Sequence, residues 1–239
     1  MSSRGRGRGL RRLIVTLVVL AVLAVVVDRA AAYVAENQLA SMAEKEAAQY
    51  DVRASSTSVK IGGFGFLPQL VNENFSKVTL TMDDPTFSGI PGEDLKVDLR
   101  DVHVPRSLLT QQSGAVSIAT TDLRLQLSPR ELGRLAAKST GLEGLSLAIV
   151  DGALRAKVSV RGIDIDVPIT PRVMEGRVVL ALGELSSSIP SYVRNAVKSQ
   201  LARGITVPEL PFGAQLTGIS VVDNSVALTA AVKDLKFDA

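Results

Sequence analysis

Apolar and polar residues alternate along most of the chain beyond residue 77, which is the pattern of β-strands with one buried face. Leu95, Val97 and Leu99 form one such run, and similar runs follow to the end of the chain. Turn-forming residues at 151–152 and 223–224 separate neighbouring runs, which predicts a hairpin at each place. The pattern therefore indicates a large antiparallel sheet.

In two of the long runs, the apolar residues shift partway from odd-numbered to even-numbered positions, or the reverse. One change falls near Arg100 and Asp101, and the other falls between Thr120 and Leu123. An extra residue in a strand has this effect, so we predict a β-bulge at each place. Strands that change face in this way are typical of strongly curved sheets.

Helical patterns precede and interrupt these strands. Residues 30–48 are good helix formers with an apolar stripe, and they predict a long helix that leads into the first strand. A capping box with proline at 128–131 predicts the start of a second helix, and another is predicted to begin near Pro190. Shorter helices are predicted after Pro105 and over residues 67–75.

The chain begins with an arginine-rich tail and an apolar segment. Residues 1–12 contain mostly arginine and glycine, and residues 13–27 are apolar with one exception. The apolar segment is at the long end of the length of a signal-peptide core and shorter than a typical spanning helix. Residues 13–32 are therefore either an uncleaved anchor or a signal peptide cleaved after Ala32. Either way, the positive-inside rule predicts a cytoplasmic tail and the export of residues 33–239, which we expect to form one α+β domain.

The positive net charge belongs to this tail rather than to the exported part. Five of the 27 basic residues lie in residues 1–12, so 22 basic residues remain against 24 acidic ones. A nucleic-acid surface on the folded part is therefore not expected.

The composition offers little catalytic or metal-binding chemistry. The chain has no cysteine, and His103 is its only histidine. His103 lies in an alternating strand run, where a solvent-facing or packed side chain is expected rather than a catalytic base. The acidic pairs at 83–84 and at Asp164 and Asp166 fit a turn and a solvated strand face. We therefore expect neither an active site nor a metal or cofactor.

One short stretch departs from the strand pattern. Residues 61–71 hold three glycines together with Phe64 and Phe66, a combination that shapes an apolar loop. The two rings are either core plugs at a corner of the fold or the lining of a cavity for apolar ligands, which would lie between the curved sheet and the long helix. On the second interpretation we predict a lipid-binding site whose apolar members are Phe64, Phe66, Leu67 and Leu70, with Lys60 and Lys77 beside them for head-group phosphate.

The same stretch is the centre of a resemblance to a known family. Its core, GFGFLPQ at residues 63–69, resembles the LmeA-like phospholipid-binding family of bacterial cell-envelope proteins. Similarity continues through 75–78, 97–102 and 210–213, and it covers most of residues 30–235. The resemblance implies an elongated tubular lipid-binding fold with a curved sheet wrapped on a long helix, and binding of phospholipids such as phosphatidylinositol derivatives. It also implies a role in envelope lipoglycan assembly or permeability.

Three functions stay open at this point. The first is an exported, membrane-associated protein that holds phospholipid acyl chains, with phospholipid and the membrane as its partners. The second is a non-catalytic scaffold of the envelope whose core is filled by side chains. The third is an envelope enzyme that acts on lipoglycans, a hypothesis that a His103 substitution with intact activity would weaken.

Overall fold

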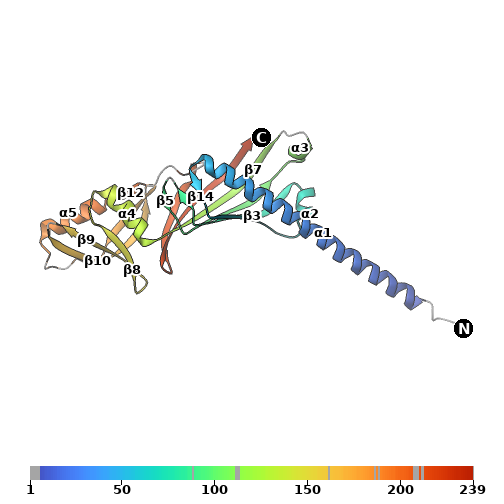
Figure 1. The fold of residues 1–239 in the computed structure, drawn as a ribbon, viewed down its shortest axis with the longest axis horizontal. Coiled ribbons are helices and arrows are strands. Elements are labelled where there is room, and N and C mark those ends of the chain that lie inside the picture. The colour runs from blue at the N-terminus through green and yellow to red at the C-terminus, as the bar shows by residue number, and fades with distance from the viewer. Residues whose placement is uncertain are drawn as a thin grey trace.

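The computed structural model describes residues 6–87, 89–110, 114–160, 162–185, 187, 189–206, 210 and 213–238, with side chains except at 6–13, 109, 110 and 238. Pro211 and Phe212 of the motif at 210–213 lie outside the described residues. The described elements combine helices with antiparallel sheets, so the α+β prediction is confirmed (Figure 1).

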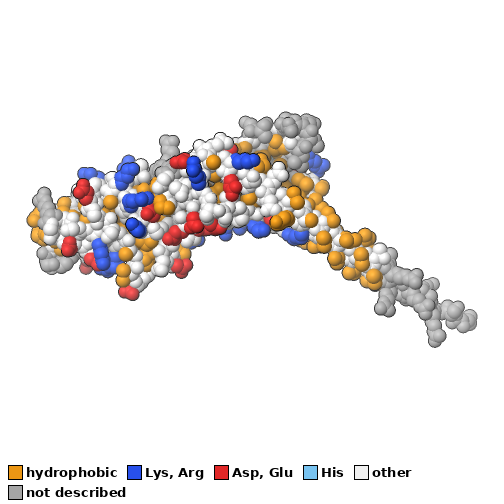
Figure 2. Space-filling model, in the orientation of Figure 1, with side chains coloured by type: hydrophobic (Ala, Val, Ile, Leu, Met, Phe, Trp, Pro, Cys, Tyr) orange, Lys and Arg blue, Asp and Glu red, His pale blue; other side chains and the backbone are white. Residues whose placement is uncertain are grey.

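The first element is a single continuous helix, α1 (Arg6–Gln49), with 44 residues and a length of about 66 Å. Its N-terminal part projects from the body of the molecule, and apolar side chains cover the described surface of that projection (Figures 1 and 2). From Ile14 to Val27 the large apolar side chains are each between 51% and 58% exposed, so the protein covers no face of this part. Among the described residues, α1 is the one helix long and apolar enough to cross a membrane.

The largest sheet has six antiparallel strands in the order β13-β14-β7-β6-β3-β2. Along the chain these strands are β2 (Ser56–Gly62), β3 (Asn74–Asp83), β6 (Asp94–His103), β7 (Ala115–Leu127), β13 (Gln215–Val222) and β14 (Ser225–Asp238). The predicted hairpin at 223–224 joins the last two. The second half of α1 lies along β2, where Glu36 accepts a 2.8 Å hydrogen bond from the Ile61 amide. This contact occupies part of an edge that no strand covers among the described residues.

The predicted changes of face occur in this sheet, but an inserted residue does not cause them. In the described strand pairings, β3, β6, β7 and β14 each skip one residue, and the skipped residues are Ser76, Asp101, Ala119 and Asp234. The strand register is the same on both sides of each skipped residue, so the predicted bulges are wrong. The four skipped residues lie opposite one another and form one row across the sheet, here called the unpaired row. Asp101 and Asp234 have positive φ angles of 51° and 54°. On one side of this row the odd-numbered residues of β6, such as Leu99, face the core, and on the other side the even-numbered residues, such as Val102, face it. Apolar side chains therefore pack on the same face of the sheet on both sides of the row.

A second unit continues from the end of β7. It is a five-stranded antiparallel sheet in the order β12-β11-β10-β9-β8, packed against two helices. Its elements are α4 (Pro129–Thr140), β8 (Ser146–Val150), β9 (Ala153–Val160), β10 (Ile163–Met174), β11 (Arg177–Leu182), α5 (Ser191–Leu201) and β12 (Ile205–Thr206). Helix α4 begins as predicted, because the Ser128 hydroxyl accepts a 3.2 Å hydrogen bond from the Glu131 amide. The core of this unit includes Val226 of β14, so the two sheets share one buried cluster.

The remaining elements are short. A small sheet in the order β1-β4-β5 consists of β1 (Val52–Arg53), β4 (Thr86–Phe87) and β5 (Ile90–Pro91), and two-residue strands are too short to predict from alternation. Helix α3 (Arg106–Thr110) follows Pro105 as predicted. Helix α2 (Phe66–Val71) is shorter than the helix predicted over 67–75, and Pro68 lies inside its first turn, where a missing amide hydrogen breaks no helical hydrogen bond.

Candidate functional site

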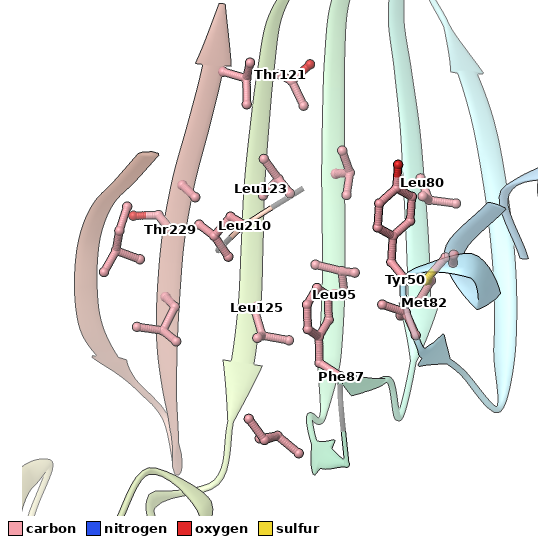
Figure 3. A pocket seen from close by; sticks show the side chains of 18 of the residues that line it. Tyr50, Leu80, Met82, Phe87, Leu95, Thr121, Leu123, Leu125, Leu210 and Thr229 are labelled. Atoms are coloured by element: carbon pink, nitrogen blue, oxygen red, sulfur yellow. The ribbon is translucent and has the colours of Figure 1, made fainter. Parts of the chain in front are cut away.

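A cavity of about 360 Å³ lies over the inner face of the six-stranded sheet, which is the face turned toward the end of α1. Its floor consists of apolar side chains from β3, β6, β7 and β14, among them Leu80, Met82, Leu95, Val97, Leu99, Leu123, Leu125, Leu228, Ala230 and Val232. Figure 3 shows several of them on neighbouring strands. These residues are the apolar positions of the alternating runs, so one sequence pattern forms both the strands and the cavity floor.

One wall of the cavity comes from the end of α1 and the small sheet that follows it. The residues that line this side are Ala47 of α1, Tyr50 just after α1, Val52 of β1, Phe87 of β4 and Ile90 of β5. Val52 pairs with Phe87 across the small sheet, and the rings of Tyr50 and Phe87 lie over the strands of the floor (Figure 3). The short strands therefore hold the Phe87 ring beside the cavity.

The second unit closes one end of the cavity. Leu132 of α4, Val178 of β11 and Ile205 of β12 line this end together with Leu127 of β7. All four are buried, and Leu132, Val178 and Ile205 belong to the core that the two sheets share. This end of the cavity is therefore bounded by tightly packed side chains.

Polar groups are few in the cavity lining. Glu46 is the one charged residue among the described side chains that line it, and three threonines contribute hydroxyl groups. The Thr229 hydroxyl accepts a 3.3 Å hydrogen bond from the Thr217 hydroxyl. The Thr121 hydroxyl is buried and has no hydrogen-bond partner among the described residues. An unpartnered buried hydroxyl is costly, so a polar atom of a ligand beside Thr121 would stabilise this part of the site.

This lining favours hydrocarbon over polar ligands. Burial of a CH₂ group contributes about 0.8 kcal/mol, whereas burial of a charged group without a partner is strongly unfavourable. The described residues contain no cluster of three or more histidine or acidic side chains that could hold a metal ion. His103 is exposed on β6, and Asp166 forms ion pairs with Arg155 and Lys157 at 2.8 and 3.6 Å. The site is therefore suited to binding an apolar chain.

Helix α2 lies at the other end of the inner face, beyond the unpaired row. Phe66 and Leu70 of α2 pack against Phe75, Val102 and Ile118, and these five residues are part of a larger apolar group, called the α2 cluster below, that also includes Leu99, Leu235 and Phe237. The rings of Phe66 and Phe75 are 5.9 Å apart between centroids. Ile118 belongs both to this cluster and to the cavity lining, as do Leu99, Leu235 and Phe237. The α2 cluster and the cavity are therefore neighbouring parts of one apolar surface.

The two phenylalanines of the GFGF stretch point in different directions. Phe66 packs in the α2 cluster, as the core-plug interpretation expects, whereas the Phe64 side chain is 93% exposed. The amide of Leu67 donates a 2.7 Å hydrogen bond to the carboxylate of Asp28 in α1. This bond attaches α2 directly to the helix that carries the apolar segment.

A buried glutamine holds the loop before α2. The Gln69 side-chain amide donates hydrogen bonds of 3.0 and 2.7 Å to the carbonyl oxygens of Gly62 and Gly65. Its side-chain oxygen accepts a 2.9 Å hydrogen bond from the Ser76 amide. Gly63 has a φ angle of 98°, and a Cβ atom there would lie 2.4 Å from the Ser76 hydroxyl. These contacts explain why the stretch combines glycines with a glutamine.

The two predicted head-group lysines both form ion pairs within the protein. Lys60 lies 3.2 Å from Glu36 of α1, and Lys77 lies 3.2 Å from Asp98 of β6. Burial raises the pKa of Asp98, but the hydrogen bonds from Thr79 and Lys77 outweigh burial, so its pKa is lower than usual. Both lysines therefore already have carboxylate partners.

None of the six predicted site residues is among the described residues that line the cavity. The structure brings Phe66 and Leu70 together in the α2 cluster and leaves Phe64 apart from them. The role of all six in lipid binding stays a prediction. The unusual loop at residues 61–71 had suggested the site. The residues that line the cavity floor are instead the alternate, apolar positions of the long strands, and this pattern was visible in the sequence.

Comparison with known proteins identifies the family. The family model described as LmeA-like phospholipid-binding matches residues 26–231, which include the second half of α1, most of both large sheets and the described cavity lining except Val232, Leu235 and Phe237. No curated protein and no solved structure gave a significant match. Since the matched region covers most of the sequence, the chain belongs to the LmeA-like phospholipid-binding family.

Proposed function

We propose that this protein is exported, stays anchored in the membrane by the apolar part of α1, and holds phospholipid acyl chains in the cavity. The observation that carries the proposal is the cavity lining, which is apolar on nearly every side. The volume of about 360 Å³ falls within the range of roughly 300–1,000 Å³ found for ligand sites. Each CH₂ group that enters would contribute about 0.8 kcal/mol.

The contacts of α1 favour an anchor over a cleaved signal. Asp28 and Ala32 are both buried against the body of the protein. Cleavage after Ala32 would remove Asp28, which accepts the hydrogen bond from the Leu67 amide. With an uncleaved anchor, residues 1–12 remain cytoplasmic and the sheets lie on the opposite side of the membrane.

The unpartnered hydroxyl of Thr121 suggests how the lipid lies in the cavity. We place a polar oxygen of the lipid, such as an ester carbonyl, within hydrogen-bonding reach of this hydroxyl. The acyl chain then runs over Leu123 and Leu125 toward the second unit, where Leu127 is buried. This orientation leaves the head group nearer to α2.

The nature of the head group rests on the family resemblance. That resemblance implies phosphatidylinositol-type lipids and a role in envelope lipoglycan assembly or permeability. Lys60 and Lys77 remain the candidates for phosphate contact, and each would exchange a carboxylate partner, Glu36 or Asp98, for the phosphate. Phe66, Leu67 and Leu70 would then lie between the head group and the cavity, beside Phe64.

The scaffold hypothesis predicts a core filled by side chains, and the ligand-sized space above the sheet argues against it. The enzyme hypothesis needs a base close to the bound lipid. His103 lies on the exposed side of β6 and is not among the described residues that line the cavity. Neither alternative has an observation in its favour.

Native mass spectrometry of the full-length protein, purified from membranes in mild detergent, tests the proposal. We expect phospholipid to remain bound, and we expect Leu123→Trp to reduce its retention about tenfold by filling the cavity beside Val97. Met174→Trp, at an exposed position of β10, is the matched control and should retain lipid as the wild type does. A wild-type protein that retains no phospholipid after incubation with phospholipid vesicles would exclude the proposed function.

A further inference from the structure

The loop that precedes α2 presents a phenylalanine to the outside. Phe64 is 93% exposed, the highest value among the large apolar side chains of the described residues. The loop around it is held in place, because Gln69 is buried and bonds to the backbone of Gly62, Gly65 and Ser76. A ring held outward by a well-ordered loop is unfavourable in water unless another apolar surface covers it.

This loop lies beside the end of the apolar part of α1. The amide of Leu67 bonds to Asp28, and Asp28 follows Val27, the last residue of the exposed apolar segment. A helix rises about 1.5 Å per residue, so the residue that contacts α2 lies only about 1.5 Å along the helix axis from the end of the apolar segment. In Figure 1, α2 lies next to α1 where the helix leaves the body of the molecule.

The surface around Phe64 has the composition of a membrane contact. Residues 61–72 contain no charged residue, and Val71, at the far end of α2, is 61% exposed. Arg29 is exposed on α1 beside the stretch, Lys60 precedes it on β2 and pairs with Glu36, and Glu73 follows it and pairs with Arg106. Apolar side chains bordered by Lys and Arg are typical of segments that lie in the interface of a bilayer.

We propose that the Phe64 loop and α2 form a membrane-contact surface, with the Phe64 ring inserted into the interface of the bilayer that holds α1. The inference rests on the proposed anchoring by α1. The bilayer is the occupant because it surrounds the segment that ends at Val27, directly beside this surface. Insertion of Phe64 would place the α2 cluster next to the lipid leaflet. The cavity adjoins the α2 cluster on the side away from the leaflet.

The absence of cysteine from the chain allows a direct test by single-site labelling. The full-length Phe64→Cys protein is labelled with an environment-sensitive fluorophore and reconstituted into vesicles of phosphatidylcholine and phosphatidylglycerol in equal parts. Met174→Cys, at an exposed apolar position in the second unit, is the matched control. We expect the label at 64 to shift its emission to the blue and to be quenched by lipids with bromine near the head group, while the label at 174 is quenched only by aqueous iodide.

The outcomes separate this inference from the anchoring on which it rests. If the protein floats with the vesicles but the label at 64 behaves like the label at 174, the membrane-contact surface is excluded and the anchor stands. If the label at 64 shifts without quenching by brominated lipid, a second protein chain covers Phe64 and the bilayer is excluded. If the protein does not float, anchoring and membrane contact both fail.

A second measurement follows transfer of lipid. In the same vesicles, Phe64→Ser should slow the uptake of a fluorescent phospholipid about tenfold, since burial of the ring no longer favours contact. Met174→Ser, in the second unit, is the matched control and should take up lipid at the wild-type rate. An unchanged uptake rate would overturn the inference.

Discussion

The carboxylate of Asp28 accepts a 2.7 Å hydrogen bond from the amide of Leu67, and this contact joins the part of α1 next to its apolar segment to α2. The two residues are far apart in sequence but lie at the point where the helix meets the folded body (Figure 1). Through this bond, an acidic residue next to the apolar segment acts as the cap of another helix.

Replacement of Asp28 by alanine should therefore loosen α2. Loss of a capping acceptor destabilises a helix start, so we expect the melting temperature in detergent to fall by about 2–4 °C. Arg29→Ala, at the exposed neighbouring position, should leave it unchanged. Equal effects of the two substitutions would show that the Asp28 contact does not stabilise the fold.

The two phenylalanines of the GFGF stretch should respond differently to truncation. Phe66→Ala should lower the free energy of unfolding by about 2 kcal/mol, less than for a fully buried ring because Phe66 is partly exposed. Phe64→Ala should change it by less than about 0.5 kcal/mol. Chemical denaturation of both variants checks this, and a large loss of stability in Phe64→Ala would contradict the structure.

Thr121→Val should affect the empty and the lipid-bound protein in opposite ways. In the empty protein the substitution removes a buried hydroxyl that lacks a partner, so stability should rise or stay the same. Lipid affinity should fall about fivefold through loss of one hydrogen bond. Thr57→Val is the control, because the Thr57 hydroxyl is also unpartnered among the described residues but Thr57, on β2, is not among the described residues that line the cavity. Binding titrations that give equal affinities for both variants would remove Thr121 from the site.

Asp94→Asn should stabilise the protein at neutral pH. Burial raises the pKa of Asp94 above its ordinary value of 3.8, and Asp83, its partner across β3 and β6, raises it further. A raised pKa means that the folded state binds the proton more tightly, so the wild type loses stability as the pH rises from 3.8 through the raised pKa.

The asparagine variant avoids this loss. Because solvent screens this partly exposed pair, we expect a gain of only about 0.5 kcal/mol at pH 7, which should disappear below pH 3.8, where the carboxyl group is protonated in both states. Unfolding curves at several pH values measure the gain. In an Asp83→Asn background the gain should be smaller, since the like charge is gone.

Much of the fold follows from patterns in the sequence. Alternation predicted the strands of the six-stranded sheet, and the capping box at 128–131 predicted α4, because burial of one face and local capping act at fixed spacings. The apolar cavity floor, including Val97 and Leu123, occupies positions that alternation had already assigned to a buried face. What alternation cannot show is whether that face meets packed side chains or open space.

Other features depend on contacts between distant segments. The ion pairs of Lys60 and Lys77 involve carboxylates on α1 and β6, so neither partner is visible in the local sequence. The change of parity near Asp101 predicted a bulge, because a single strand cannot show that its neighbours skip a residue in the same row. The opposite directions of Phe64 and Phe66 follow from the start of α2 at Phe66, which the sequence alone did not reveal.

The unpaired row has a consequence for the length of hydrocarbon that the sheet can hold. Strand β7 has 13 residues, which corresponds to about 44 Å at the usual rise per residue. The hydrocarbon layer of a bilayer is about 30 Å thick, so one leaflet accounts for about 15 Å. Because apolar side chains stay on one face on both sides of the row, Val116 and Leu127 mark the two ends of a long apolar surface, with the Thr121 hydroxyl as a polar point between them. An acyl chain that leaves a leaflet beside α2 would find apolar contacts along its whole length.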